Sequence, residues 1–276
     1  MLDAVQPLTG SETAPLRQAR MRVLAEALVS PIDVPAHDNS AMDGYAFDGA
    51  KLTGGRMQLT VAGTALAGQP YKAVVKDGEC VRIMTGAMMP PGCDTVIPLE
   101  ATQSADGVVR FATADVKRGA NRRLRGEDLA RGQEALARGR LLRAADLGLA
   151  ASLGVPALPV LPRVRVAYFS TGDELREPGS RLDEGCVYDS NRYTLTALLE
   201  QTGCEVIDLG AVADDPKALA DTLTRASMAD AIITSGGAAA GDADHTAKVM
   251  ASMGEVLFWR LAMKPGRPFA FGRIAG

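Results

Sequence analysis

The stretch from Ala231 to Thr246, AIITSGGAAAGDADHT, restricts the possible folds more than any other part of the chain. Its first four residues are short, apolar and rich in β-branched side chains, which favours a buried parallel strand. Ser235–Gly237 then lets the backbone turn without Cβ clashes, Gly241 closes the loop, and Asp242 or Asp244 is a suitable helix cap. This order of strand, glycine loop and helix predicts an α/β sheet.

The glycine loop is also a candidate anion site. A loop of this kind points free backbone N–H groups and the positive end of a helix dipole at whatever lies above the strand, so it favours phosphate. Its spacing is neither that of the Walker motif nor that of the dinucleotide motif G-x-G-x-x-G. A tight connection without any ligand is therefore an equal alternative.

Composition excludes several classes of protein. A length of 276 residues suggests about two domains, and a net charge of −3 argues against a general binder of nucleic acid or of membrane surfaces. The four cysteines lie far apart, which predicts reduced thiols rather than a zinc site or disulfides. The start of the chain does not read as a secretory signal, so we expect a cytoplasmic protein. Glycine and proline interrupt the uncharged run from Leu147 to Pro162, which predicts a linker and not a membrane helix.

The first half of the chain predicts a helix followed by strands. Apolar residues recur near helical spacing from Ser11 to Val29. The segment from Pro31 to Phe47 is dense in Asp, Asn and Ser, so Asp43 and its neighbours offer several oxygen ligands, with self-capping turns as the alternative. Short segments between Met57 and Phe111 alternate with Gly and Pro turns, which predicts a small all-β unit. Thr85 ends one of these strands, where its hydroxyl would meet a substrate or form a plain turn.

The segment from Lys117 to Arg143 has nine basic and three acidic residues. Its Arg-Gly pairs resemble an RNA-binding tract, but the apolar residues between them favour turns on a solvated surface. The arginines at positions 122, 123 and 125 stand close to two acids, Glu127 and Asp128. They could form a rim that receives an anion.

The second half alternates strands with helices. Strands are expected at residues 165–170, 205–209 and 231–234, and helices at residues 191–201, from 216 and at 246–253. This order implies a doubly wound parallel sheet, in which ligands bind at the carboxyl ends of the strands. Acids at Glu174, Asp214 and Asp244 would repel a bare phosphate there, so we expect Mg²⁺ or a polar ring between them. Lys264 and Arg267 would hold an oxyanion, or else form a solvated hairpin turn.

The combination of motifs resembles a known family. DNSAMDGYAF, RIMTGA, RRLRGED, FSTGDEL, YDSNR, ADDP, SGGAAAGDADHT and FWRLAMKPGRPFAFG occur in the order found in molybdopterin molybdenumtransferases of the MoeA and gephyrin E-domain type. The resemblance covers nearly the whole chain. It implies an enzyme that inserts molybdenum from molybdate into adenylylated molybdopterin (molybdopterin adenylate) and releases AMP, with Mg²⁺ required. It also implies an elongated homodimer with a shared cleft, and molybdopterin adenylyltransferase as the upstream partner.

The resemblance also implies an architecture and a set of site residues. Residues 1–160 would form an extended linking region with a small β domain inserted at about 30–130, and residues 161–276 a doubly wound α/β molybdopterin-binding domain. The implied catalytic residues are Asp43, Thr85, Asp128, Glu174, Asp214 and Asp244. The implied cofactor-binding residues are Ser235, Gly236, Gly237, Gly241, Lys264 and Arg267, while the metal ligands stay unidentified.

The chain departs from the family pattern at several places, among them Arg267 where Lys is common and His37 and His245 where aromatic residues are usual. Ala238–Ala240 replaces a stretch that usually carries a serine, so backbone donors would do that binding. The family's GLPGNP segment does not follow, which implies a fragment truncated at both ends, an incomplete α/β domain and low turnover. Two alternatives remain open, a non-catalytic molybdopterin-binding or scaffold protein of the same fold, and a Mg²⁺-dependent nucleotide hydrolase.

Overall fold

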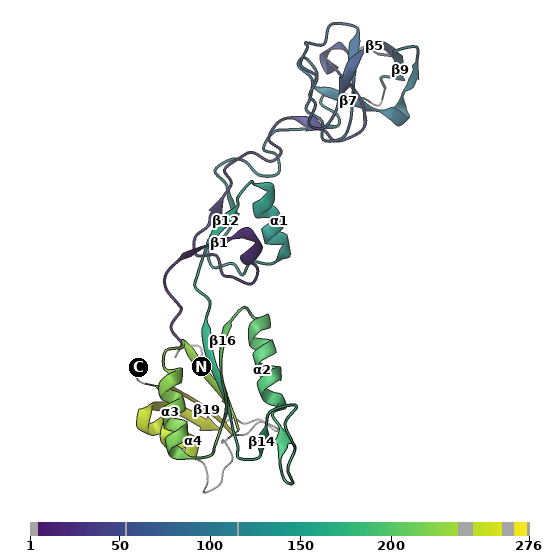
Figure 1. The fold of residues 1–276 in the computed structure, drawn as a ribbon. Coiled ribbons are helices and arrows are strands. Elements are labelled where there is room, and N and C mark those ends of the chain that lie inside the picture. The colour runs from purple at the N-terminus through teal and green to yellow at the C-terminus, as the bar shows by residue number, and fades with distance from the viewer. Residues whose placement is uncertain (1–4, 53, 115, 237–244, 261–267, 275–276) are drawn as a thin grey trace. The chain divides into compact units, whose positions relative to one another are not determined.

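The computed structural model describes residues 5–52, 54–114, 116–236, 245–260 and 268–274 of the chain (Figure 1). Two compact units are present. The β unit comprises residues 27–137 and 148–155, and the α/β unit comprises residues 1–26, 138–147 and 156–276. The boundaries implied by the resemblance, 1–160 and 161–276, stay a prediction.

The β unit is built around a six-stranded sheet in the order β7-β4-β6-β5-β9-β8. Its strands are β4 (Gly44–Phe47), β5 (Arg56–Ala65), β6 (Glu79–Ile83), β7 (Thr95–Pro98), β8 (Gln103–Ala105) and β9 (Val108–Ala112). Single turns of 3₁₀ helix lie at Gly49–Lys51 and Leu99–Ala101. Two short ribbons pair β2 (Leu28–Val29) with β11 (Glu134–Leu136) and β3 (Asn39–Ser40) with β10 (Arg122–Arg123). The predicted all-β unit is confirmed.

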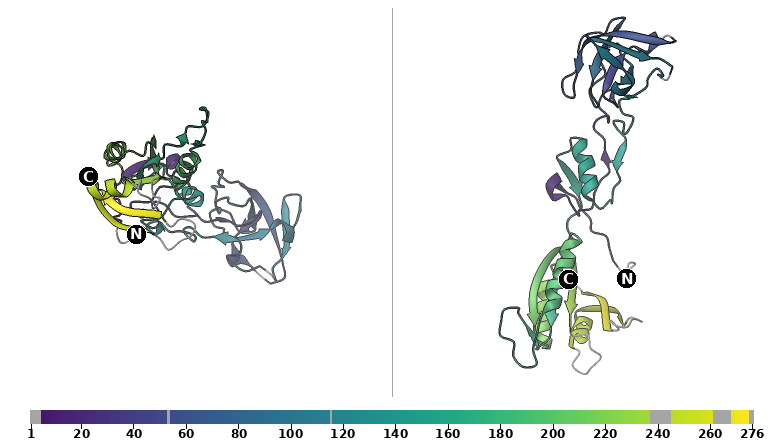
Figure 2. Two further views of the ribbon diagram at one scale, coloured as in Figure 1. Left: turned by 90° about the horizontal axis from the view of Figure 1, so that it is seen from below. Right: turned by 90° about the vertical axis from the view of Figure 1, so that its right-hand side faces the viewer.

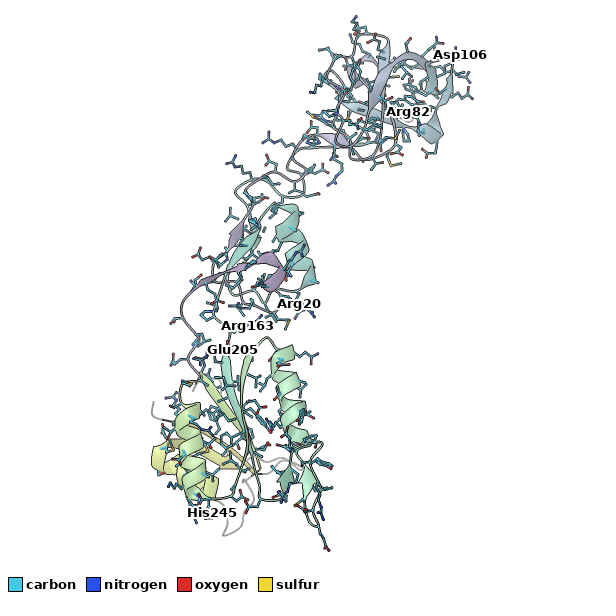
Figure 3. The ribbon with its side chains drawn as sticks, viewed as in Figure 1. Arg20, Arg82, Asp106, Arg163, Glu205 and His245 are labelled. Carbon is cyan, nitrogen blue, oxygen red and sulfur yellow. The ribbon has the colours of Figure 1, made fainter. Side chains whose placement is uncertain are left out.

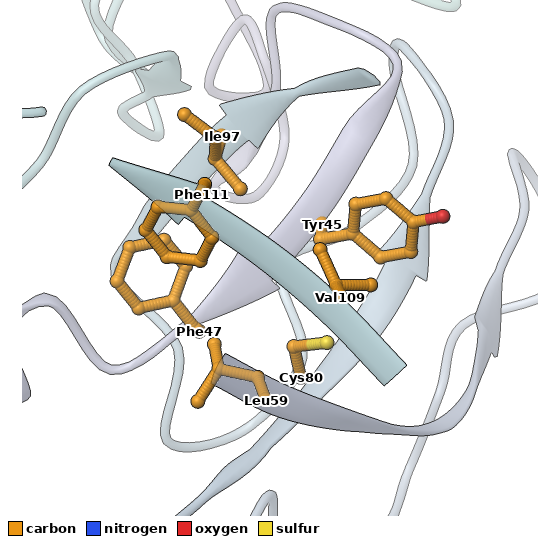
Figure 4. Packing of buried hydrophobic residues seen from close by; sticks show 7 residues of the cluster. All are labelled: Tyr45, Phe47, Leu59, Cys80, Ile97, Val109 and Phe111. Atoms are coloured by element: carbon orange, nitrogen blue, oxygen red, sulfur yellow. The ribbon is translucent and has the colours of Figure 1, made fainter. Parts of the chain in front are cut away.

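Both faces of this sheet are buried. Tyr45 and Phe47 point into one cluster, where the Phe47 and Phe111 rings lie 5.3 Å apart at an interplanar angle of 47° (Figure 4). Ala46, between them in sequence, belongs to the cluster on the opposite face, as strand alternation requires. Burial raises the pKa of the Cys80 thiol to about 12, so this cysteine acts as an apolar core residue.

The prediction of a helix from Ser11 to Val29 is wrong. The segment forms β1 (Glu12–Pro15), a 3₁₀ turn (Leu16–Gln18) and, in the β unit, β2. Met21 has a φ of 60°, which a helix does not allow, and the backbone N–H of Leu24 donates to the carbonyl of Arg140 at 2.9 Å. The apolar spacing therefore reflects burial against a distant segment and not a helical face.

The predicted linker from Leu147 to Pro162 is also regular structure. It contains most of α1 (Ala144–Ser152) and all of β12 (Ala157–Val160), which pairs antiparallel with β1. Pro159 fits within β12 because it only has to accept a hydrogen bond there, from the backbone N–H of Ala25 at 2.9 Å. Within the described ranges, no helix is long and apolar enough to cross a membrane.

The centre of the α/β unit is a parallel three-stranded sheet in the order β16-β13-β17. Its strands are β13 (Arg165–Thr171), β16 (Glu205–Val212) and β17 (Ala231–Ser235), and the helices α2 (Ser190–Gln201) and α3 (Pro216–Ala226) connect them. Phe169 packs against Leu219 and Leu223 of α3, whereas the next residue, Ser170, bonds to Asp189 at the start of α2. Alternation along β13 thus places the two helices on opposite faces of the sheet, as Figure 1 shows. The predicted doubly wound α/β fold is confirmed.

Two smaller ladders complete this unit. The strands β14 (Leu175–Arg176) and β15 (Val187–Tyr188) pair within the segment that joins β13 to α2. Beyond β17, α4 (His245–Met253) precedes the antiparallel strands β18 (Gly254–Arg260) and β19 (Pro268–Ile274). This hairpin, yellow in Figure 2, lies beside α4.

Asp146 should stabilise the start of α1. Its buried carboxylate accepts the backbone N–H of Arg143 at 2.9 Å and Nε of Arg140 at 2.7 Å, and both hydrogen bonds hold its pKa below the ordinary value of 3.8. We expect Asp146→Asn to lower the free energy of unfolding at pH 7 by about 1–2 kcal/mol, measured by urea unfolding.

The pH dependence of this loss follows from the lowered pKa. The stabilisation by a carboxylate with a depressed folded-state pKa is complete above the ordinary pKa and disappears as the pH falls through the depressed value. The difference between the native protein and Asp146→Asn should therefore shrink below about pH 4. The matched control is Asp221→Asn at an exposed position of α3, where we expect a change within about 0.5 kcal/mol. A difference that is independent of pH would contradict this account.

Candidate functional site at the carboxyl edge of the parallel sheet

The three parallel strands end at one edge of the sheet, where the predicted ligand turns follow them. In Figure 3, Glu205 at the start of β16 and His245 at the start of α4 mark the opposite ends of this sheet. The chain order reverses between β13 and β17, because β16 lies on one side of β13 and β17 on the other. Ligands of open α/β sheets bind beyond the carboxyl ends of the strands at such a reversal.

The turn after β13 places Glu174 at this edge. Gly172 has a φ of 150°, and a Cβ there would lie 2.6 Å from a carboxylate oxygen of Glu174, so the side chain folds back over the glycine. Asp173 accepts the backbone N–H of Asp214 through Oδ1 at 3.2 Å. The turns that carry Glu174 and Asp214, two of the predicted site residues, are thereby joined.

The turn after β17 begins with the predicted Ser235 and Gly236. Gly236 has a φ of 87°, and a Cβ at this position would lie 2.1 Å from the carbonyl oxygen of Thr171. Only glycine permits so close an approach between the ends of β17 and β13. The other predicted residues of this edge, Gly237, Gly241, Asp244, Lys264 and Arg267, lie outside the described residues.

Three polar side chains below this edge, Tyr168, Ser170 and Asp189, were not predicted, and they join the predicted Ser235. The Tyr168 hydroxyl lies 2.5 Å from Oγ of Ser235 and 3.1 Å from Oγ of Ser170, and Ser170 donates to Oδ2 of Asp189 at 2.5 Å. Asp189 also caps α2 by accepting the backbone N–H of Arg192. The Asp-Ser-Asn start of this helix is a capping signal that could have identified Asp189, whereas no local signal indicates Tyr168.

An ion-pair cluster holds the segment that carries Glu174 against α2. Arg192 donates Nη1 to Glu177 at 2.6 Å and Nε to both carboxylate oxygens of Asp208 at 2.8 Å. The hydroxyl of Tyr193 donates to the other oxygen of Glu177 at 2.6 Å. The segment after β13 is thus fixed to the helix that follows it.

In the β unit, the structure brings the predicted Asp43 and Thr85 together. Asp43 precedes β4 and Thr85 follows β6, and the antiparallel pairing of Gly44 with Ile83 makes these ends neighbours. Both the backbone N–H and the hydroxyl of Thr85 donate to Oδ1 of Asp43 at 2.7 Å. These two bonds, the backbone one first, hold the pKa of Asp43 below its ordinary value, so this exposed side chain is an ionised carboxylate at neutral pH.

Asp128 belongs to a different cluster, and the predicted anion rim is not free. Arg123 pairs with both Glu127 and Asp128. Arg122 pairs with Asp38, which also accepts the backbone N–H of Arg125. These guanidinium groups are therefore occupied by carboxylates of the chain itself, some of them distant in sequence.

Side-chain and backbone hydrogen bonds join two segments of the β unit near this cluster. Asp33 accepts Nε of Arg125 at 2.6 Å and the backbone N–H of Arg131 at 2.8 Å, and Val34 donates its N–H to Leu129 at 2.8 Å. The N–H of Asp128 donates back to the carbonyl of Val34. Residues 33–38, where the chain enters the sheet of this unit, are thus bonded to residues 122–131, where it leaves.

Two family models match the sequence. One, described as the MoeA N-terminal region (domain I and II), matches residues 1–154, and the other, described as a probable molybdopterin binding domain, matches residues 167–276. The chain is 43% identical over 276 residues to the molybdopterin molybdenumtransferase of Haemophilus influenzae, covering 99% of this chain and 68% of that protein. The chain belongs to the molybdopterin molybdenumtransferase family.

Other members of the family agree with this assignment. The molybdopterin molybdenumtransferase 2 of Mycobacterium tuberculosis is 39% identical, with 100% of this chain and 70% of that protein covered. A crystal structure of the molybdopterin biosynthesis MoeA protein from Pyrococcus horikoshii matches with a TM-score of 0.83 at 30% identity, covering 98% of this chain and 69% of the other. The chain therefore has the MoeA fold.

The hydroxyl of Thr85 should contribute to the low pKa of Asp43. We expect Thr85→Val to raise this pKa toward its ordinary value, because the variant loses one of the two hydrogen bonds to the ionised form. The measurement is an NMR titration of the Asp43 carboxyl carbon. Thr85→Ser keeps the hydroxyl and should leave the pKa unchanged, and equal pKa values in Thr85→Val and the native protein would refute the assignment.

Proposed function

We propose that this chain inserts molybdenum from molybdate into molybdopterin adenylate and releases AMP and the molybdenum cofactor. The observation that carries the proposal is the arrangement at the carboxyl edge of the sheet. The turns that carry Glu174 and Asp214 are joined there by a hydrogen bond, and Gly236, after the end of β17, lies against Thr171 at the end of β13. In the described part of the chain, the buried Thr171 hydroxyl at this edge has no hydrogen-bond partner, which suits a polar ligand.

The relatives favour this activity over the alternatives. Those of Haemophilus and Mycobacterium are named as molybdopterin molybdenumtransferases, and neither is named as a scaffold or as a nucleotide hydrolase. When a thiolate sulfur replaces an oxygen of molybdate, that oxygen takes up two protons and leaves as water, and a carboxyl group within hydrogen-bonding reach can deliver them. The roles proposed below for the acids follow from that requirement.

We assign three groups of residues to the reaction. The acids and the hydroxyl that orient the substrate and carry protons are Asp43, Thr85, Asp128, Glu174, Asp214 and Asp244. The residues that contact the pterin or the nucleotide phosphate are Ser235, Gly236, Gly237 and Gly241. The cations Lys264 and Arg267 receive molybdate, because a positive turn suits a tetrahedral dianion.

The acids of this edge fit Mg²⁺ that is shared with the ligand. Among the described residues, no three His, Cys, Asp or Glu side chains are grouped to hold a metal ion by themselves. A nucleotide-bound Mg²⁺ needs only one or two protein carboxylates, because phosphate and water supply its other ligands. Glu174 and Asp214 would hold the ion, which would neutralise phosphate charge beside them.

We further propose a cytoplasmic homodimer that receives its substrate from a molybdopterin adenylyltransferase. The proposal rests on the family resemblance. Light scattering measures the mass in solution, and a monomer at micromolar concentration would refute the homodimer.

Asp214 and Asp215 provide a matched pair for testing the site. Asp215 caps α3 by accepting the N–H of Ala218 at 2.8 Å, and asparagine caps helices equally well. We expect Asp214→Asn to release AMP from molybdopterin adenylate about a hundredfold more slowly than the native protein does. Asp215→Asn loses the same charge, and its rate should stay within about threefold of the native rate. Equal rates for the two variants would refute the role of Asp214.

Mg²⁺ should strengthen the binding of AMP. We expect calorimetry to show about tenfold tighter binding with Mg²⁺, because the ion offsets repulsion between the phosphate and the acids of this edge. Glu174→Gln should lose most of this gain. Glu184→Gln, at an exposed position of the same segment, is the control and should keep it. Equal affinities with and without Mg²⁺ would refute the shared ion.

A further inference from the structure

A chain of hydroxyl groups runs beneath the candidate site to Ser235, and its three buried members have no part in the proposed chemistry. It joins Ser235, Tyr168, Ser170 and the carboxylate of Asp189 by three contacts of 2.5, 3.1 and 2.5 Å. Tyr168 and Ser170 are completely buried and Asp189 is 3% exposed. Only Ser235, at the end of β17, is partly accessible, so the chain leads from the core to the edge where the ligand is proposed to bind.

Counting protons fixes the direction of these hydrogen bonds. Asp189 accepts at both oxygens, from the N–H of Arg192 and from the hydroxyl of Ser170. Because the single proton of Ser170 points to Asp189, the contact between Tyr168 and Ser170 is a hydrogen bond only if Tyr168 donates. The proton of Tyr168 is then used, so the contact between Tyr168 and Ser235 requires Ser235 to donate.

The opposite direction is unfavourable. If Tyr168 donated to Ser235, its oxygen and that of Ser170 would face each other 3.1 Å apart in a buried site with no proton between them. Leaving buried acceptors without a donor costs free energy, whereas a chain of hydroxyls that ends on a carboxylate is strengthened by polarisation. The charge of Asp189 therefore sets the orientation of every hydroxyl up to Ser235.

We propose that Tyr168 is a positioning residue that holds the proton of Ser235 inward, so that Ser235 presents its oxygen to the ligand as a hydrogen-bond acceptor. The inference rests on the proposed function of this edge and adds that Ser235 prefers a ligand group that donates a hydrogen bond. A donor such as an amino or ring N–H group of a pterin matches such an oxygen. A phosphate oxygen, which only accepts, does not.

A purely structural role for Tyr168 predicts a different result. The strands β13 and β17 already pair in register from Val166 to Ser170, so the hydroxyl chain is not needed to join them. If Tyr168 merely stiffened the edge, its loss would weaken all ligands alike. If Tyr168 orients Ser235, its loss should weaken ligands that donate to Ser235 but not ligands that accept from it, since the freed Ser235 hydroxyl can then donate.

The test is Tyr168→Phe in the 276-residue chain, with ligand binding followed by NMR titration. The probes are 6-hydroxymethylpterin, which offers N–H donors and no phosphate, and inorganic phosphate. We expect the pterin to bind about fivefold more weakly to the variant, the effect of one hydrogen bond, and phosphate to bind as well as or better than before. In a Ser235→Ala background, Tyr168→Phe should have no further effect on the pterin.

Ser170→Ala provides a second, independent variant. It leaves Tyr168 with no acceptor except Ser235, so it should produce the same change in preference if Tyr168→Phe proves unstable. Equal losses for pterin and phosphate, no loss for the pterin, or an undiminished effect of Tyr168→Phe in the Ser235→Ala background would overturn the inference alone. A native chain that binds neither probe would overturn the proposed function of this edge as well.

Discussion

The parallel pairing of β13 with β16 on one side and β17 on the other is the constraint on which the candidate site depends. Because side chains alternate along β13, Phe169 belongs to the apolar layer under α3, while Tyr168 and Ser170 face the start of α2. The same pairing ends all three strands at one edge. One buried strand thus provides an apolar core on one side and an oriented polar chain on the other.

The sequence predicted those parts of the fold that local signals specify. The apolar strand that begins at Ala231 and the Asp215-Pro216 start of α3 were found because burial, capping and helix entry depend on neighbouring residues. The segments 11–29 and 147–162 were misassigned because their structure depends on each other. The strands β1 and β12 pair across about half of the chain, and neither segment carries a signal for the other.

The candidate site could be predicted in part for the same reason. Asp43 and Thr85 were both named, but only the register of β4 with β6 makes them partners. An anion rim of arginines near Asp128 was one interpretation of the sequence, but acids earlier in the chain already pair with Arg122 and Arg125. Tyr168 was missed because its partners, Ser170 of the same strand and Ser235 of another, are joined by no single motif.

The bonds between residues 33–38 and 122–131 have a consequence for how this architecture can vary. The polypeptide enters and leaves the six-stranded sheet through two segments that are fastened side by side. The residues between these two segments form an inserted sheet whose two ends are held at a fixed distance from each other, whatever the length of the insertion. Residues can therefore be added to or removed from this sheet during evolution without displacing the rest of the chain, so the sheet can be exchanged as a module.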